Sequence, residues 1–347
     1  KIYYLIISRR LKMTKKLGKQ TVELKSRPVI AGAYSSVGKK EGEGPLGKYF
    51  DTVYKDEFLH KKTWEQAESE LLRQTVFGAA ANAAVPFIDI DYIFAGDLIN
   101  QCTSSSFAIK DFGIPFFGIF GACSTIAEGL SLASMMIDGG FAEKTICATS
   151  SHFCGAEKQF RFPLEYGSTR TPTSQWTVTG SGAIVLAKDG DGPKITHVTT
   201  GKIIDLGVSD ANNMGAAMAP AAADTIYTHL KDTGRSADFY DLIITGDLAN
   251  TGSNLLLSLL NKQDVDISEN HRDCGCMIFD AQTQNVKSGG SGCGCCASVF
   301  CGYFYKQLLC KKVKNILLVA TGALMNPASA NQGQTIPSIA HAVAIEG

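Results

Sequence analysis

The stretches FGACS at residues 120–124 and SGCGC at residues 291–295 decide the fold of this chain. Each is a turn of small residues that opens a predicted helix, and each helix leads to a predicted strand. The chain distance from a cysteine of the turn to an alanine of that strand is the same in both places, from Cys123 to Ala148 and from Cys295 to Ala320. Two copies of one turn–helix–strand unit indicate an internal duplication.

A second pair of stretches supports the duplication. DYIFAGDLIN at residues 91–100 matches DLIITGDLAN at residues 241–250 in six of ten places, and both pairs of repeats occur in the same order along the chain. We therefore predict two similar halves, residues 17–190 and residues 191–347, with the two cysteine turns related by a pseudo-twofold axis.

Short apolar runs alternate with helical stretches throughout both halves. Thr63 with Gln66 three residues later is typical of a capping box and predicts a helix to about Ala84. A helix is also predicted over residues 124–138 and a strand over residues 277–279. Alternation of strands and helices predicts the α/β class with a mainly parallel sheet.

Composition excludes several classes of protein. The chain has 347 residues, of which 45% are hydrophobic and only 19% charged, and it contains 35 glycines. Disorder requires low hydrophobicity with high net charge, and coiled coils are poor in glycine. Lysine plus arginine balance aspartate plus glutamate at 33 each, so the chain offers nucleic acid no sequence-independent attraction. We expect no nucleic-acid partner.

The N-terminus and the cysteines indicate a protein of a reducing compartment. The apolar run at residues 2–7 is shorter than a signal-peptide core or a membrane span. Met13 resembles a start residue, so residues 1–16 are expected to be an extension outside the fold. Eleven cysteines without a secretory signal are expected to be free thiols.

Cys123 is the first candidate for chemistry. It lies at the predicted N-terminus of a helix, where backbone N–H groups and the helix dipole lower the pKa of a thiol and attract anions. Cys123 and its neighbour Ser124 are therefore candidate ligand-binding residues. The alternative is that Cys123 is only a small buried residue in a tight turn.

Four further residues are candidates for the same site. Asp97 and Asp247 each follow a glycine at the end of a predicted strand, and His152 follows another strand. Open α/β sheets bind ligands at the carboxyl ends of their strands, so we predict that Cys123, Asp97 and His152 line one pocket. Arg161 could hold a carboxylate through two hydrogen bonds. The alternatives are turn formation by the aspartates, a structural histidine and a solvated arginine.

A cluster of cysteines between Cys274 and Cys301 does not have the spacing of common metal sites. Cys274 with Cys276 and Cys293 with Cys295 are C-x-C pairs, whereas zinc ribbons use C-x₂-C. We therefore expect no metal and no cofactor, and the role of this cluster stays open.

The turns and the duplication resemble the thiolase superfamily, in which two βαβαβαββ halves form a layered αβαβα core and a nucleophilic cysteine opens a buried helix. Longer strings resemble the stage V sporulation protein AD family over residues 17–347. Those strings are KLGKQT at 16–21, EGPLG at 43–47, AGDLINQ at 95–101, FGACST at 120–125, ATSSH at 148–152, MGAAMAPAAADTI at 214–226 and VATGAL at 319–324.

The resemblance implies a role in endospore formation, namely uptake of dipicolinic acid, with its calcium chelate, into the developing spore. It also implies partners among the integral membrane proteins of the stage V A group. The expected location is the cytoplasmic side of the forespore or spore inner membrane, reached through those partners. A homodimer, common in the superfamily, is a further expectation.

This chain departs from the condensing enzymes of the superfamily at their other catalytic positions. Where they carry a histidine the sequence reads GDLAN at residues 246–250, and where they carry an asparagine or histidine it reads GCG at residues 292–294. We therefore expect a non-catalytic binding protein, and the alternative is an acyltransferase of thiolase or ketoacyl-synthase type using Cys123.

Two modes of binding a flat dianion are open from the sequence. In the first, the helix N-terminus at residues 123–125 holds one carboxylate, and Arg161 or another cation holds the other. In the second, Asp97 and Asp247 complete the oxygen coordination of a bound calcium ion.

Overall fold

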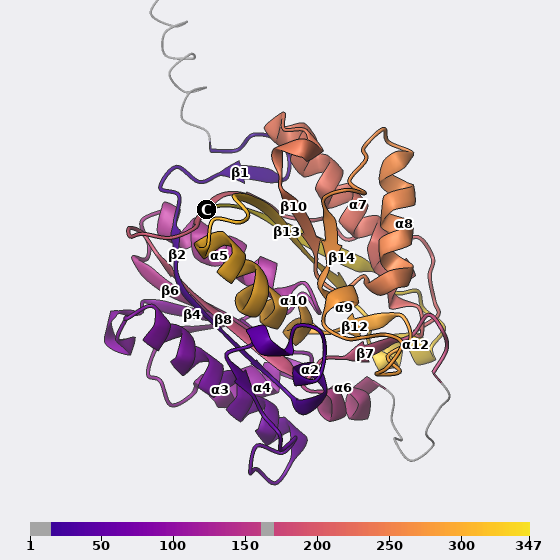
Figure 1. Ribbon diagram of the computed structural model, residues 1–347, viewed down its shortest axis with the longest axis horizontal. Coiled ribbons are helices and arrows are strands. Elements are labelled where there is room, and N and C mark those ends of the chain that lie inside the picture. Colours follow the sequence, from indigo (N-terminus) through magenta and orange to yellow (C-terminus); the bar gives the residue numbers. More distant parts are fainter. Residues whose placement is uncertain (1–14, 161–169) are drawn as a thin grey trace, which may run out of the picture.

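The structure is a computed structural model and describes residues 15–160 and 170–347. Its main sheet contains two sets of five strands that meet side by side (Figure 1). From the centre outward, the first set is β2 (Val29–Val37), β8 (Gly180–Ala187), β6 (Lys144–Ser151), β4 (Tyr92–Gly96) and β5 (Phe116–Gly118). The second set is β9 (Lys194–Thr199), β14 (Ser338–Glu346), β13 (Asn315–Ala323), β10 (Leu242–Thr245) and β11 (His271–Asp273).

The two sets repeat one topology. In each set the three outer strands are parallel, and the two inner strands are antiparallel to their neighbours. β2 and β9 touch at one pair of residues, Val29 and Lys194. The predicted boundary between residues 190 and 191 falls between β8 and β9. Short strands β1 (Thr21–Glu23) and β3 (Thr52–Val53) pair with β9 and β2.

Helices form three layers with the two sets of strands between them (Figure 1). On the outside, α3 (Trp64–Asn82) and α4 (Thr103–Ile109) cover the first set, and α7 (Met214–Thr233) and α8 (Ala249–Asn261) cover the second. In the centre, α5 (Thr125–Asp138) contacts strands of both sets, and α10 (Cys293–Val299) lies against α5 and the first set. This is the expected αβαβα arrangement of the thiolase-like fold.

Shorter elements complete the chain. A second small sheet pairs β7 (Gln175–Thr177) with β12 (Gly289–Ser291) in parallel. The remaining α-helices are α2 (Lys39–Gly42), α6 (Phe153–Phe160), α9 (Cys274–Met277), α11 (Tyr305–Leu309) and α12 (Pro327–Asn331). Within the described ranges, no helix is both long enough and apolar enough to cross a membrane.

Local sequence signals explain where several helices begin and end. Thr63 caps α3 by accepting a hydrogen bond from the backbone N–H of Gln66, as the capping box predicts. The predicted strand at residues 277–279 is wrong. Asp273 accepts a hydrogen bond from the N–H of Cys276 and caps the short helix α9, which ends at Met277.

The two cysteine turns approach each other in the central layer, as a pseudo-twofold relation predicts. At one contact the N–H of Gly294 donates to Ser151 Oγ at the end of β6, at 3.0 Å. At the other, Gly322 at the end of β13 lies so close to Gly121 that an added Cβ would be 2.2 Å from its carbonyl oxygen.

The sheet register corrects the predicted equivalence by one residue. Ala95 of β4 pairs with Ala148, and Thr245, its counterpart in β10, pairs with Val319. Val319 rather than Ala320 is therefore the counterpart of Ala148. On this register the chain position equivalent to Cys123 is occupied by Gly294 and not by Cys295.

Candidate functional site

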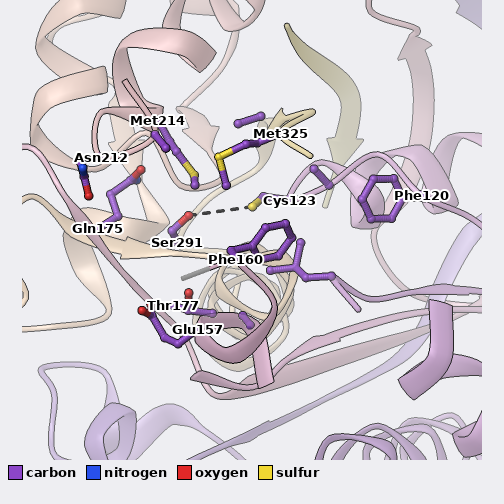
Figure 2. A pocket seen from close by; sticks show the side chains of 16 residues that line it. Phe120, Cys123, Glu157, Phe160, Gln175, Thr177, Asn212, Met214, Ser291 and Met325 are labelled. Carbon is purple, nitrogen blue, oxygen red and sulfur yellow. Dashed lines mark hydrogen bonds between the residues drawn. The ribbon is translucent and has the colours of Figure 1, made fainter. Parts of the chain in front are cut away.

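A cavity of about 650 Å³ lies beside the Cys123 turn (Figure 2). Its walls come from the two turns, from α6 and β7, and from the segments around Met214 and Met325. The larger apolar side chains of the wall are Leu98, Phe120, Phe160, Met214 and Met325. The polar ones are Glu157, Gln175, Thr177, Asn212 and Ser291. The cavity is therefore mainly apolar, with polar groups contributed largely by β7 and by Ser291.

Hydrogen bonds within the turn before α5 engage several of its own backbone groups. The N–H of Ser124 donates to the carbonyl of Gly121 at 3.0 Å, and the N–H of Thr125 donates to the carbonyl of Ala122 at 3.4 Å. Ser124 is fully buried and donates its hydroxyl to the Gly121 carbonyl at 2.6 Å. These donors of Ser124 and Thr125 are therefore engaged within the turn, and binding of a carboxylate by Ser124 and this helix N-terminus stays a prediction.

Cys123 lines the cavity, but the predicted effect on its thiol is wrong in sign. The residue is 6% exposed, and its Sγ lies 3.9 Å from Ser291 Oγ. Burial raises the pKa of Cys123 well above its ordinary value, and the nearby negative charge of Asp247 raises it further. Both effects outweigh the helix N-terminus, so the group is a neutral thiol at physiological pH.

Asp247 lies directly behind Ser291. Its Oδ2 accepts hydrogen bonds from Ser291 Oγ at 2.8 Å and from the N–H of Gly292 at 3.0 Å. Its Oδ1 accepts from Thr321 Oγ1 at 2.8 Å. Burial raises the pKa of Asp247, and these donors oppose the increase. Asp247 is thus connected to Cys123 through Ser291, although it is not itself part of the cavity wall.

Asp97, the counterpart of Asp247, serves the turn in which it lies. Its carboxylate accepts from the N–H of Ile99 at 2.8 Å and from the N–H and hydroxyl of Ser105 at 2.7 and 2.6 Å. It is fully buried and does not line the cavity. Its charge, added to burial, raises the pKa of Glu68, a fully buried residue of α3. Sequence reasoning missed Glu68 because nothing in a helical repeat marks a buried carboxyl.

His152 lies at a different cavity, of about 340 Å³, whose walls include Glu41 and Trp176. Its Nε2 lies 2.9 Å from the carbonyl of Glu57. Ser151 points toward Gly294, and side chains next to each other at a strand end point to opposite sides. The structure therefore does not bring His152 to the Cys123 cavity. Arg161 lies outside the described residues.

Three residues of the cavity wall were missed as site residues by sequence reasoning. The sequence predicted only a turn at Ser291, and Gln175 lies in no recognised motif. Glu157 forms a buried ion pair with Arg170 at 3.1 Å, and Arg170 in turn lies over the ring of Trp176 at 4.6 Å. The signal for Ser291 in the sequence was its hydroxyl side chain at the start of the glycine-rich stretch SGCGC.

Comparison with known proteins decides the family. Residues 18–346 match the sequence profile described as Stage V sporulation protein AD. The chain is 44% identical over 329 residues to Stage V sporulation protein AD of Bacillus subtilis (strain 168), covering 95% of this chain and 97% of that protein. This chain belongs to the stage V sporulation protein AD family.

Solved structures with a similar fold have low sequence identity to this chain. 3-Oxoacyl-[acyl-carrier-protein] synthase III from Aquifex aeolicus VF5 is 15% identical with a TM-score of 0.56, covering 92% of this chain and 100% of that chain. A Xanthomonas campestris OleA variant is 14% identical with a TM-score of 0.56, covering 95% and 98%. At this identity the likeness shows the thiolase-like fold alone.

Proposed function

We propose that this sporulation protein binds dipicolinic acid, free or as its calcium chelate, as a non-catalytic component of uptake into the developing spore. Membership of the family and a cavity at the Cys123 turn support the proposal. The cavity lies where the two turns, α6 and β7 meet. Its apolar side chains suit a flat ring, and its polar wall suits the substituents of that ring.

The set of side chains in the described wall around Cys123 is the observation that carries the non-catalytic part of the proposal. A condensing enzyme needs a thiolate and a group that takes its proton. Here burial and Asp247 hold the pKa of Cys123 high. The described wall contains no histidine, lysine or arginine, and its carboxylate, Glu157, is paired with Arg170.

The geometry bears on the groups that each of the two predicted binding modes would use. The donors of Ser124 and Thr125 are engaged within the α5 turn. Asp97 and Asp247 each accept three hydrogen bonds, and two of those to Asp247 come from the wall residues Ser291 and Gly292. We propose that the ligand instead meets the polar groups of β7 and Ser291, with Arg161 as the cation for a carboxylate.

Location and partners follow from the same proposal. We propose that the protein reaches the cytoplasmic side of the forespore or spore inner membrane through integral membrane proteins of the stage V A group, and that it forms a homodimer. Flotation with anionic liposomes that lack partner proteins tests the first point. Strong binding there would show that the protein carries its own means of membrane attachment.

Isothermal titration with dipicolinate, with and without calcium, tests ligand binding directly. Ala211 lines the cavity, so Ala211→Trp fills it and is expected to weaken binding at least tenfold. Ala281→Trp is the matched control, because Ala281 is exposed and outside the cavity. Equal affinities of the two variants would place the ligand elsewhere or refute binding.

The alternative is acyl transfer through Cys123. The hydrogen-bond path from Cys123 through Ser291 to Asp247 is the observation in its favour, since it connects the thiol to a carboxylate. Intact-mass analysis after incubation with an acyl-CoA separates the two functions. Acylation that disappears in Cys123→Ser supports an enzyme, and an unchanged mass supports a binding protein.

A further inference from the structure

The amide of Gln175 is fixed in one orientation by the backbone around it. Its Nε2 donates to the carbonyl of Asp247 at 2.5 Å and to the carbonyl of Gly290 at 3.3 Å. Rotating the amide would place its oxygen against these two acceptors, so the hydrogen bonds decide which atom is oxygen. Arg170 also donates to the backbone carbonyl of Gln175 at 2.9 Å, which holds the residue in place.

The oxygen of that amide is an acceptor without a donor. Gln175 is 6% exposed, and among the described residues no group donates a hydrogen bond to its Oε1. Gln175 belongs to the wall of the Cys123 cavity, and Figure 2 shows its side chain among the polar groups of that wall. A buried acceptor left without a donor costs free energy, which a ligand carrying a donor recovers.

We infer that Gln175 is a specificity-determining residue of this cavity, and that it selects ligands that turn an electropositive group, an N–H or O–H donor or a bound calcium ion, toward its amide oxygen. A site built to hydrogen-bond one group of a ligand discriminates against an analogue that lacks it. This inference deepens the proposed function, because it concerns the form in which a dicarboxylate enters the same cavity.

Fully deprotonated dipicolinate carries acceptors only, two carboxylates and a ring nitrogen. Placed against Gln175 Oε1 it would face an acceptor with another acceptor. Two sources supply the missing positive group. A ligand proton, as in a protonated carboxyl or an amide analogue, gives a donor, and calcium accepts amide oxygens as ligands.

The first experiment does not depend on dipicolinate. Benzamide and acetophenone have similar shapes, but only benzamide carries N–H donors, and their affinities for the full chain are compared by ligand-observed NMR titration. We expect a preference for benzamide of roughly tenfold, the size of one hydrogen bond. The preference is expected to vanish in Gln175→Met, which keeps the length of the side chain and removes the acceptor.

Thr177→Val is the matched control, since Thr177 is the next residue of β7 that lines the same cavity. It can change the affinity for both probes but is expected to leave their ratio as in the unaltered protein. Thermal melting of Gln175→Met shows whether the wall remains folded. If it does not fold, the wild-type preference and the Thr177→Val ratio still decide the inference, because an absent preference overturns it.

The second experiment identifies the source of the positive group. Dipicolinate and its monoamide, 6-carbamoylpicolinate, are titrated with and without calcium into the unaltered protein and Gln175→Met. A monoamide preference or a calcium requirement that depends on Gln175 supports the inference and names the source. Dipicolinate that fails to bind while benzamide is still preferred refutes the proposed function alone. Ratios that are the same in both proteins throughout overturn the inference.

Discussion

Glu41→Gln is expected to remove a large part of the pH dependence of stability between pH 5 and 8. Glu41 is fully buried in α2, and its Oε1 accepts a hydrogen bond from the N–H of Thr179 at 2.9 Å. Its Oε2 lies against Gly38, where an added Cβ would be only 2.8 Å away. Burial raises the pKa of Glu41 from 4.5 to about 7. A glutamine keeps the acceptor for Thr179 and carries no charge.

The size and direction of the effect follow from this pKa. A raised pKa in the folded state means that the folded protein holds a proton that the unfolded chain has lost. The stability linked to Glu41 is fully present below about pH 4.5 and is lost as the pH rises through about 7. The difference of pKa corresponds to about 3 kcal/mol. Part of this stability is already lost at pH 5, so between pH 5 and pH 8 the free energy of unfolding of the glutamine variant is expected to gain about 2.5 kcal/mol relative to that of the unaltered protein.

Other groups titrate in the same range, so a difference between two proteins must be measured. Burial lowers the pKa of His197 and His341 to about 4 and of His229 to about 3. A histidine with a lowered folded pKa gains stability as the pH rises toward 6.5, which opposes the effect of Glu41.

Urea unfolding of both proteins at several pH values gives the free energy of unfolding, and subtraction cancels the shared histidines. Glu43→Gln is the control, because Glu43 belongs to the same turn and is exposed. A difference between the Glu41→Gln variant and the unaltered protein that stays constant from pH 5 to 8 would refute the reasoning.

Four further substitutions test the packing and the charges around the cavity. Gly322→Ala is expected to lower the free energy of unfolding by about 1–3 kcal/mol, since its Cβ would meet the Gly121 carbonyl at 2.2 Å. Gly155→Ala, in a helix with ordinary contacts, is expected to raise the free energy of unfolding by up to about 1 kcal/mol. Chemical unfolding of both variants measures the two effects. Arg170→Met removes the buried ion pair with Glu157, so a lower free energy of unfolding is expected. A melting temperature equal to that of the unaltered protein would contradict it. Asp247→Asn removes the charge that adds to burial in raising the pKa of Cys123. Alkylation of Cys123 by iodoacetamide, measured by peptide mass spectrometry, is therefore expected to begin at lower pH. An unchanged pH profile of alkylation would show that burial alone sets the pKa of Cys123.

The architecture could be predicted from the sequence because the duplication repeats the same short sequence patterns in both halves. The repeated strand-end stretches at residues 91–100 and 241–250 lead into α4 and α8 at corresponding places in the two sets of strands. Their equivalence needs no knowledge of contacts. The register error of one residue arose because Cys123 and Ala148 were matched to Cys295 and Ala320 by residue type. The equally spaced pair Gly294 and Val319, which the sheet register selects, carries different residue types.

The chemistry of the site could be predicted only in part, because it depends on contacts between the halves. The helix N-terminus beside Cys123 is a local feature and was correctly located. The charge that helps to raise the thiol pKa belongs to Asp247, which is distant in sequence and reaches the cavity through Ser291. His152 illustrates a different difficulty, since a strand end alternates its side chains and one residue decides which cavity a group faces.

Asp97 and Asp247 occupy equivalent places in the two halves but bind different groups. Both aspartates follow a glycine at the end of equivalent strands. The Asp97 carboxylate accepts a hydrogen bond from Ser105, which follows it in the same half. The Asp247 carboxylate accepts hydrogen bonds from Ser291 and Gly292 of the second turn. That binding holds the second turn against the first, where the Cys293 thiol donates to the Ala122 carbonyl at 2.9 Å. The second half therefore supplies the back wall of a cavity whose thiol comes from the first, and the negative charge that holds this wall also keeps the thiol neutral.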